Sequence, residues 1–204
     1  MDGHLFAPPA TITPVPTYLE MRIELQHVRP SIWRRFLIRP DATFAELHEA
    51  IQAACGWKNY HLYCFYAKAV GPNPLAGVPD EDYPGMPDAE RVPLRTHFGP
   101  SRSCLYLYDY GDGWEHEVRL EGAQELPEIF ERKLLDGARA FPPEDCGGIS
   151  RYEECVALSR AGNQTKAEQR ELLKWIGRWH PERFERDKVA RQFDRPKARK
   201  SAGA

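Results

Sequence analysis

Apolar and polar residues alternate after residue 18, with the apolar positions at Leu19, Met21, Ile23 and Leu25. A period of two places alternate side chains on one face of a β-strand, so this segment predicts a half-buried strand. The run 32–39 follows a turn at Arg29 and Pro30 and predicts the hairpin partner of the first strand. The apolar run 61–67 predicts a third strand.

A helical period appears after residue 43. Thr43 and Glu46 have the spacing of a capping box, in which each side chain accepts a hydrogen bond from the backbone of the other residue. The apolar stripe that follows consists of Phe44, Leu47, Ile51 and Ala54. Gly56 can adopt the left-handed backbone that ends a helix. We therefore expect an amphipathic helix that faces the strands.

The middle of the chain combines a long loop with a second hairpin. Residues 71–100 contain seven prolines and predict an irregular surface loop. The apolar runs 104–110 and 114–121 flank a glycine-containing turn and predict a hairpin. A helix of mixed register is expected over roughly residues 126–135, followed by a loop over residues 141–149.

The C-terminal part predicts helices. Capping boxes at residues 150–153 and 165–168 mark two expected helix starts. A helical apolar stripe follows, made of Leu172, Trp175, Ile176 and Trp179. Pro181 is expected to open a last, more basic helix.

This order of elements predicts an α+β fold, with a β-grasp-like mixed sheet packed on one amphipathic helix and a C-terminal helical extension. The expected parts are a flexible N-terminal segment (1–17), an α+β core domain (18–149) that includes the long loop 71–100, a helical extension packed on the core (150–195) and a disordered tail (196–204).

The composition is that of a globular protein, because 42% of the 204 residues are hydrophobic. A net charge of −2 gives no overall basic field for nucleic acid. No apolar run reaches transmembrane length and the N-terminus lacks a signal-peptide pattern, so a cytoplasmic location without membrane contact is expected. The five cysteines include no Cys-x-x-Cys pair, which argues against a disulfide framework and a zinc ribbon.

The densest polar chemistry lies in residues 108–116 (YDYGDGWEH). If Gly111 and Asp112 form a two-residue hairpin loop, Asp109 lies opposite Trp114 and shares a strand face with His116. Polar groups on such an apolar face need hydrogen-bond partners. They could form a structural network that closes the hairpin, or a ligand or metal site.

A second polar segment, residues 142–148 (PPEDCGG), precedes an expected helix start. Its carboxylates could cap that helix, or could face the hairpin across a cleft. The candidate binding residues are His61, Asp109, Asp112, Trp114, His116, Glu144, Asp145 and Cys146. The candidate catalytic residues among them are Asp109, His116, Glu144 and Asp145. Because no paired local metal ligands occur, no cofactor is expected, and a divalent metal is the alternative.

Positive charge concentrates at the C-terminus, where residues 183–200 hold eight lysines or arginines and three acids. Such a segment can make weak, salt-sensitive contacts to nucleic acid, or can simply be solvated. The candidate contacts are Arg183, Arg186, Lys188 and Arg191.

Four sequence blocks carry a family resemblance: residues 29–35 (RPSIWRR), 44–48 (FAELH) with the later GW and HL pairs at 56–57 and 61–62, 108–116, and 142–148. With these blocks the chain resembles the plasmid pRiA4b ORF-3-like proteins, also known as passenger proteins of bacterial insertion-sequence elements. The resemblance covers roughly residues 18–195 and implies a compact α+β domain carried on plasmids and transposons. Tyr63 stands where we expect the family often to have a second histidine.

The leading functional hypothesis is a non-enzymatic accessory or binding protein of plasmids or transposable elements that engages a protein or nucleic-acid partner. The absence of familiar catalytic motifs favours this hypothesis. The alternative is a metal- or acid/base-dependent enzyme, such as a hydrolase, that uses the Asp/His/Glu cluster.

Overall fold

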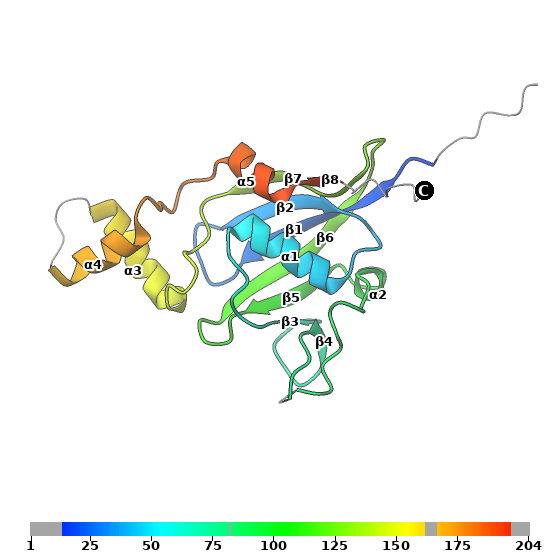
Figure 1. Ribbon diagram of the computed structural model, residues 1–204, viewed down its shortest axis with the longest axis horizontal. Helices are drawn as coiled ribbons and strands as arrows, with labels where there is room; N and C mark the ends of the chain where they lie inside the picture. The colour runs from blue at the N-terminus through cyan, green and yellow to red at the C-terminus, as the bar shows by residue number, and fades with distance from the viewer. Residues whose placement is uncertain (1–13, 82, 162–166, 197–204) are drawn as a thin grey trace, which may run out of the picture.

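The computed structural model describes residues 14–81, 83–161 and 167–196 (Figure 1). The strands are β1 (Thr17–Leu25), β2 (Trp33–Ile38), β3 (Tyr63–Tyr66), β4 (Pro74–Gly77), β5 (Ser103–Tyr108), β6 (Trp114–Glu125), β7 (Phe130–Ala138) and β8 (Arg195–Pro196). They form one sheet in the order β4-β3-β5-β6-β1-β2-β7-β8. Each neighbouring pair of these strands is antiparallel. The α+β class is confirmed, whereas a mixed, β-grasp-like sheet is not.

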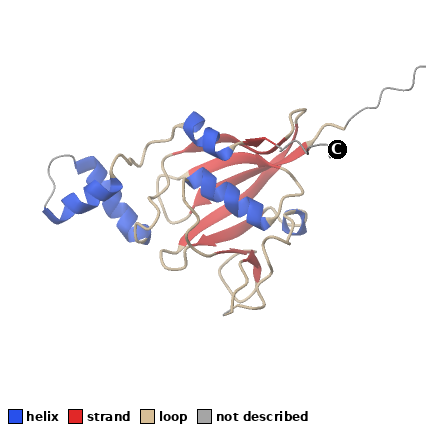
Figure 2. Cartoon of the chain, viewed as in Figure 1, coloured by secondary structure: helices blue, strands red, loops and turns tan. Residues whose placement is uncertain are grey.

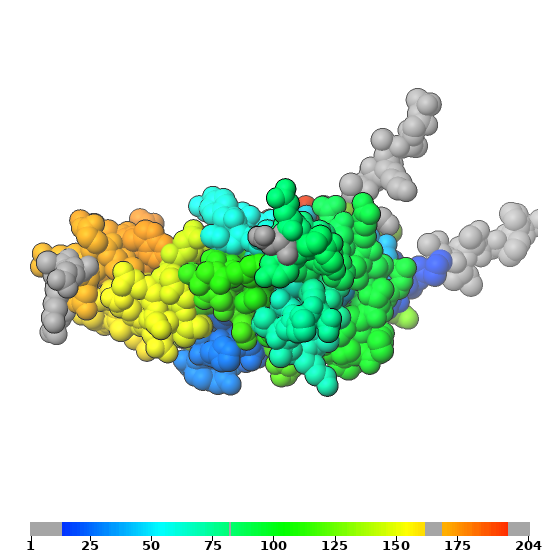
Figure 3. All heavy atoms as spheres, turned by 90° about the horizontal axis from the view of Figure 1, so that it is seen from below, coloured from blue at the N-terminus to red at the C-terminus, as the bar shows by residue number. Residues whose placement is uncertain are grey.

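The helices are α1 (Phe44–Cys55), α2 (Arg95–Phe98), α3 (Gly148–Ala161), α4 (Ala167–Ile176) and α5 (Arg186–Phe193). Figure 2 shows α1 and α5 together on one face of the sheet. In Figure 3, α3 and α4 form one end of an elongated molecule, and Figure 1 shows that this end lies away from the strands. The chain leaves the sheet after β7 and returns to it through α5 and β8.

The first hairpin and α1 confirm the local sequence signals. Residues 19–24 of β1 pair with all of β2, with Ile23 opposite Arg34. Thr43 and Glu46 form both hydrogen bonds of the capping box, and Gly56 ends α1 in the left-handed conformation with φ of 80°. The expected stripe of α1 is buried against the sheet. Burial of an apolar stripe supplies most of the stability of such a helix.

The predicted helix over residues 126–135 is wrong, because this segment is mostly β7. Phe130, Arg132 and Leu134 alternate on a buried face. The guanidinium of Arg132 lies over the Phe193 ring, and its Nε donates to the Phe193 carbonyl at 2.7 Å. In the sequence an arginine counts as a polar residue, so a buried arginine interrupts the alternation of apolar and polar residues that indicates a strand.

Other boundaries also differ from the sequence prediction. The expected loop 71–100 contains β4 and α2, and Leu94 and Phe98 from it are part of the core. Helix α3 begins at Gly148, so the predicted start at residues 150–153 lies inside it. Helix α5 begins at Arg186 rather than Pro181, whose carbonyl accepts a hydrogen bond from Ala140 instead.

Of the predicted stripe at residues 172–179, Leu172 and Ile176 are buried, whereas Trp175 is half exposed. The capping box at residues 165–168 begins outside the described residues. Residues 1–13 of the expected N-terminal segment and residues 197–204 of the expected tail also lie outside the described residues. Within the described chain, no helix has both the length and the apolarity needed to cross a membrane.

Candidate functional site

The second hairpin has a longer turn than predicted. Tyr108 pairs with Trp114 and Tyr106 pairs with His116, so Asp109 lies outside the strand. Asp109 has a φ of 57°, and its carbonyl accepts a hydrogen bond from Gly113 at 2.7 Å. The predicted register is therefore wrong by one residue, and a shift of one residue moves a side chain to the other face of a sheet. Asp109 and His116 do not form one cluster.

His116 and Trp114 lie in the core beneath α1. The His116 ring packs among Trp57, Tyr106 and Phe141, with ring centroids 5.4 to 5.8 Å away. Among the described residues, neither ring nitrogen of His116 has a hydrogen-bond partner of normal geometry, although backbone groups of Trp114 and Tyr106 lie close enough to oppose in part the effect of burial on its pKa. Burial lowers the pKa of His116 to about 4, so the ring is neutral at pH 7.

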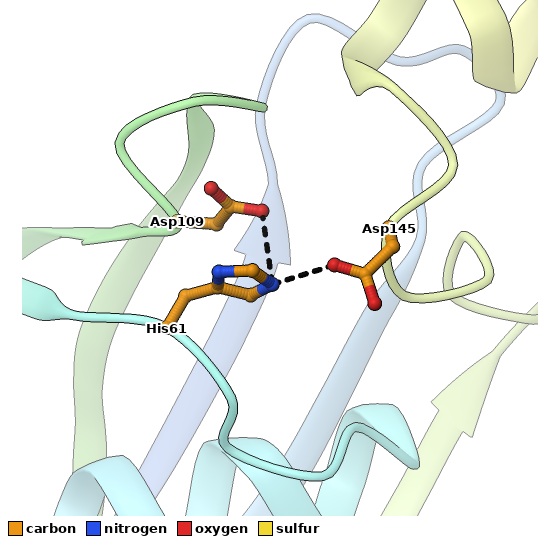
Figure 4. Close-up of side chains that lie close together, drawn as sticks. All are labelled: His61, Asp109 and Asp145. Carbon is orange, nitrogen blue, oxygen red and sulfur yellow. Dashed lines mark hydrogen bonds and ion pairs between the residues drawn. The ribbon is translucent and has the colours of Figure 1, made fainter.

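Asp109 instead meets His61 and Asp145 (Figure 4). The Nε2 atom of His61 lies 2.6 Å from Asp145 Oδ1 and 3.5 Å from Asp109 Oδ2. The side chains of His61, Asp109 and Asp145 are 33%, 10% and 53% exposed, respectively. The hydrogen bond with Asp145 is the largest influence that raises the pKa of His61. One imidazole nitrogen thus faces two carboxylates at the molecular surface.

The turn itself holds Asp109 in place. Its Oδ1 accepts hydrogen bonds from the backbone amides of Gly111 at 3.0 Å and Asp112 at 3.2 Å. Its own amide donates to the carbonyl of Leu62 at 3.0 Å, which ties the turn to the segment that carries His61. An aspartate that binds following amides is typical of tight turns. Asp109 Oδ2 is the oxygen that remains directed toward His61.

Glu144 joins the loop 142–148 to β5 and to the segment that follows α1. Its Oε1 accepts a hydrogen bond from the Tyr108 hydroxyl at 2.6 Å, and its Oε2 accepts one from the Lys58 amide at 2.7 Å. The Tyr108 ring stacks on Trp57 with centroids 5.1 Å apart. Both carboxylate oxygens of Glu144 are therefore engaged in structural contacts away from the first turn of α3.

The turn 109–113 and the loop 142–148 are also in direct contact. Asp112 Oδ2 accepts a hydrogen bond from the Gly147 amide at 3.0 Å. Gly148 has a φ of 75°, and a Cβ atom there would lie 2.9 Å from the Asp112 carbonyl oxygen. Cys146 is buried in this loop, and burial raises the pKa of its thiol to about 12. The thiol is therefore protonated at neutral pH.

The basic candidates lie elsewhere, in and before α5. Arg186 donates to the Leu135 carbonyl at 2.8 Å and pairs with Asp187. Arg183 donates to the Arg178 carbonyl at 3.0 Å. Arg183 and Lys188 border a small pocket of about 180 Å³, and Arg191 is on the last turn of α5. The structure does not bring these cations to the His61 cluster.

Sequence reasoning missed an aromatic pocket beside β3 and β4. Its volume is about 460 Å³, and three of its lining residues are Tyr66, Tyr83 and Tyr110. Tyr110 follows Asp109 directly, so the pocket and the His61 cluster share one turn. The sequence did contain a signal for this pocket, namely one tyrosine in the proline-rich loop and another in the tight turn of the second hairpin.

Comparison with known proteins gives a family and a related structure. A family model for "Plasmid pRiA4b ORF-3-like protein" matches residues 17–188. The chain is 37% identical over 167 residues to "Uncharacterized protein y4hQ" of Sinorhizobium fredii (strain NBRC 101917 / NGR234), which covers 80% of this chain and 82% of the relative.

A solved structure has a similar fold. The crystal structure of "Protein of Unknown Function MM3350" from Methanosarcina mazei Go1 matches with a TM-score of 0.71 and 27% sequence identity. The match covers 87% of this chain and 99% of that one. The names of both relatives state no activity.

Proposed function

The chain belongs to the plasmid pRiA4b ORF-3-like family, and we propose that it is a non-enzymatic accessory protein of plasmids or transposable elements. Its role is to bind a protein partner through the aromatic pocket beside β3 and β4. The partner presents a lysine or arginine side chain to this pocket.

The observation that carries the proposal is the pocket together with the apolar surface around it. A volume of about 460 Å³ lies within the usual range for ligand pockets. Nine large hydrophobic side chains are exposed in the described part of the chain. Three of them line this pocket: Val70, Tyr83 and Tyr110. Concentrated apolar exposure of this kind marks interaction surfaces.

The charge near the pocket selects the partner. None of the described lining residues is charged. The adjoining segment 79–90 has five acidic residues and no lysine or arginine. Asp80 accepts a hydrogen bond from the Tyr83 amide at 2.8 Å, which holds a carboxylate at this border. Burial, followed by nearby groups that include Asp80, raises the pKa of Tyr110 to about 12. Aromatic faces and nearby carboxylates favour cations and disfavour phosphates.

The test is an NMR titration of the ¹⁵N-labelled full chain with N-acetyl-arginine amide, N-acetyl-lysine amide and N-acetyl-glutamate amide. We expect the two cationic probes to shift resonances of residues 66–86 and 110, and Tyr110→Ala to abolish the shifts. Ile129→Ala is the matched control, since Ile129 is exposed and lies outside the pocket. Equal shifts with the glutamate probe, or shifts confined to α5, contradict the proposal.

An acid/base enzyme is a second candidate, favoured by the hydrogen bond between His61 and Asp145 at a partly exposed site. Hydrolysis of p-nitrophenyl acetate and bis(p-nitrophenyl) phosphate tests it. Turnover that disappears in His61→Gln supports the enzyme, and rates equal to the buffer for the wild-type protein reject it for these reactions.

A further inference from the structure

Three segments that are distant in the sequence bring potential metal ligands to one point at the surface. His61 precedes β3, Asp109 follows β5 and Asp145 lies in the loop before α3. We propose that these three side chains bind one divalent transition-metal ion, of which Mn²⁺ is a representative. This inference is independent of the aromatic pocket beside β3 and β4, because none of the three residues lines it.

The ligand atoms already face a common centre. His61 Nε2, Asp109 Oδ2 and Asp145 Oδ1 come from three different chain segments, and the three ligand atoms of this group lie within 4.8 Å of one another. Metal bonds of about 2.1 Å place neighbouring ligand atoms about 3 Å apart. The 2.6 Å separation between His61 and Asp145 must therefore widen by a few tenths of an ångström. Asp145 can adjust in this way, since its side chain is half exposed.

The neighbouring acidic residues, Glu144 and Asp112, already accept hydrogen bonds from other groups. Both oxygens of Glu144 accept hydrogen bonds from Tyr108 and Lys58. Asp112 Oδ2 accepts a hydrogen bond from the Gly147 amide. Asp109 is different, because two backbone amides hold its Oδ1 while its Oδ2 is directed at His61. Outer contacts that fix a ligand in this way are typical of metal sites and increase affinity.

A structural ion pair does not account equally well for the arrangement. One protonated histidine carries a single charge, whereas two carboxylates face it. Exposed pairs of this type contribute little stability. A dication neutralises both carboxylates at once and links the turn 109–113 to the loop 142–148 and to the segment before β3.

The donor atoms indicate the class of ion. Mg²⁺ and Ca²⁺ prefer sites made entirely of oxygen, whereas imidazole nitrogen suits transition ions. One nitrogen with two carboxylate oxygens therefore favours Mn²⁺ or Zn²⁺ over Mg²⁺ and Ca²⁺. Three protein ligands leave positions for water or for a donor atom from a partner.

The experiment is a titration of the metal-stripped full chain with MnCl₂, followed by the EPR signal of free Mn²⁺ and by calorimetry. Mn²⁺ avoids the thiol binding that would complicate a Zn²⁺ titration. We expect one ion per chain, and affinity reduced at least about tenfold in His61→Gln and in Asp145→Asn. Mg²⁺ should compete poorly.

Two matched variants serve as controls. His27→Gln removes an exposed histidine that faces the single carboxylate Glu115, and Asp41→Asn removes an exposed aspartate paired with Arg39. Both should bind Mn²⁺ as the wild type does. Circular dichroism establishes that each variant is folded. An absence of Mn²⁺ binding at millimolar concentration, binding unchanged in both site variants, or equal binding of Mg²⁺ would each overturn the proposal.

Discussion

Replacing His116 by phenylalanine should remove much of the acid sensitivity of the fold. His116 is fully buried among three aromatic rings, and neither ring nitrogen has a hydrogen bond of normal geometry among the described residues. Phenylalanine keeps a planar ring in this position and carries no polar atom. It also removes the cost of burying a polar ring without well-formed hydrogen bonds, at most about 1–3 kcal/mol, which offsets the strain of the slightly larger ring.

The magnitude follows from the pKa of His116. Burial lowers this pKa from 6.5 to about 4, so the folded protein keeps the ring neutral while the unfolded chain takes up a proton below pH 6.5. His116 therefore does not make the free energy of unfolding depend on pH above pH 6.5. As the pH falls from 6.5 toward 4, proton uptake by the unfolded chain lowers the free energy of unfolding. A difference of about 2.5 pKa units corresponds to roughly 3 kcal/mol.

Urea unfolding, followed by circular dichroism at several pH values between 7 and 4.5, measures this effect. The variant should lose less free energy of unfolding than the wild type over this range. His48, whose pKa burial also lowers to about 4, remains in the variant and provides the residual pH dependence. His116→Leu is the second variant if phenylalanine does not fit. Parallel curves for wild type and variants would falsify the assignment of His116 as a neutral core ring.

Three further predictions concern the loops and the basic segment. Glu144→Gln should lower the free energy of unfolding by about 1–3 kcal/mol, because the two donors bind different oxygens of Glu144 and glutamine replaces one of these oxygens by an NH₂ group, which cannot accept. An unchanged melting temperature contradicts this. Gly113→Ala should cost about 1–2 kcal/mol from its φ of 68° alone. Gly148→Ala should cost more, because its Cβ also meets Asp112, and equal losses in chemical denaturation would reject this contact. If the chain binds DNA, a variant with glutamine at Arg183, Arg186, Lys188 and Arg191 should weaken binding and reduce its salt dependence in anisotropy titrations; unchanged affinity and salt slope place the contact elsewhere. Substitution is preferable to truncation here, because Phe193 of α5 is part of the core.

Short-range patterns predicted the parts of the fold that depend on local chemistry. Strand β1 follows from alternation, and α1 follows from its capping box, its stripe and Gly56. Strand β7 was missed because Arg132 is buried with its guanidinium against Phe193, more than 60 residues away in the sequence. Arg34 is a similar case, since it is buried and donates to the carbonyls of Ala54 and Arg139. Contacts between such distant residues leave no local signal.

The candidate site was predicted in composition but not in arrangement. Sequence reasoning selected His61, Asp109 and Asp145 as members of a larger set, and the structure brings these three together. It also paired Asp109 with His116, which the structure separates. The separation depends on the length of one turn, because a five-residue turn places Asp109 outside the strand and leaves His116 facing the core. The backbone conformation of Asp109, with φ of 57°, is uncommon for a residue other than glycine and was not expected.

The central position of β1 has a consequence for synthesis of the protein on the ribosome. One edge of β1 pairs with β2, but its other edge pairs with β6. At about 5–20 residues per second, the roughly 90 residues that separate these partners take on the order of 5–20 s to make. During that time the nascent hairpin presents an unpaired strand edge, the type of edge that recruits other chains. Ribosome-bound chains that end before β6 should therefore depend on chaperones, whereas chains that include it can close the middle of the sheet.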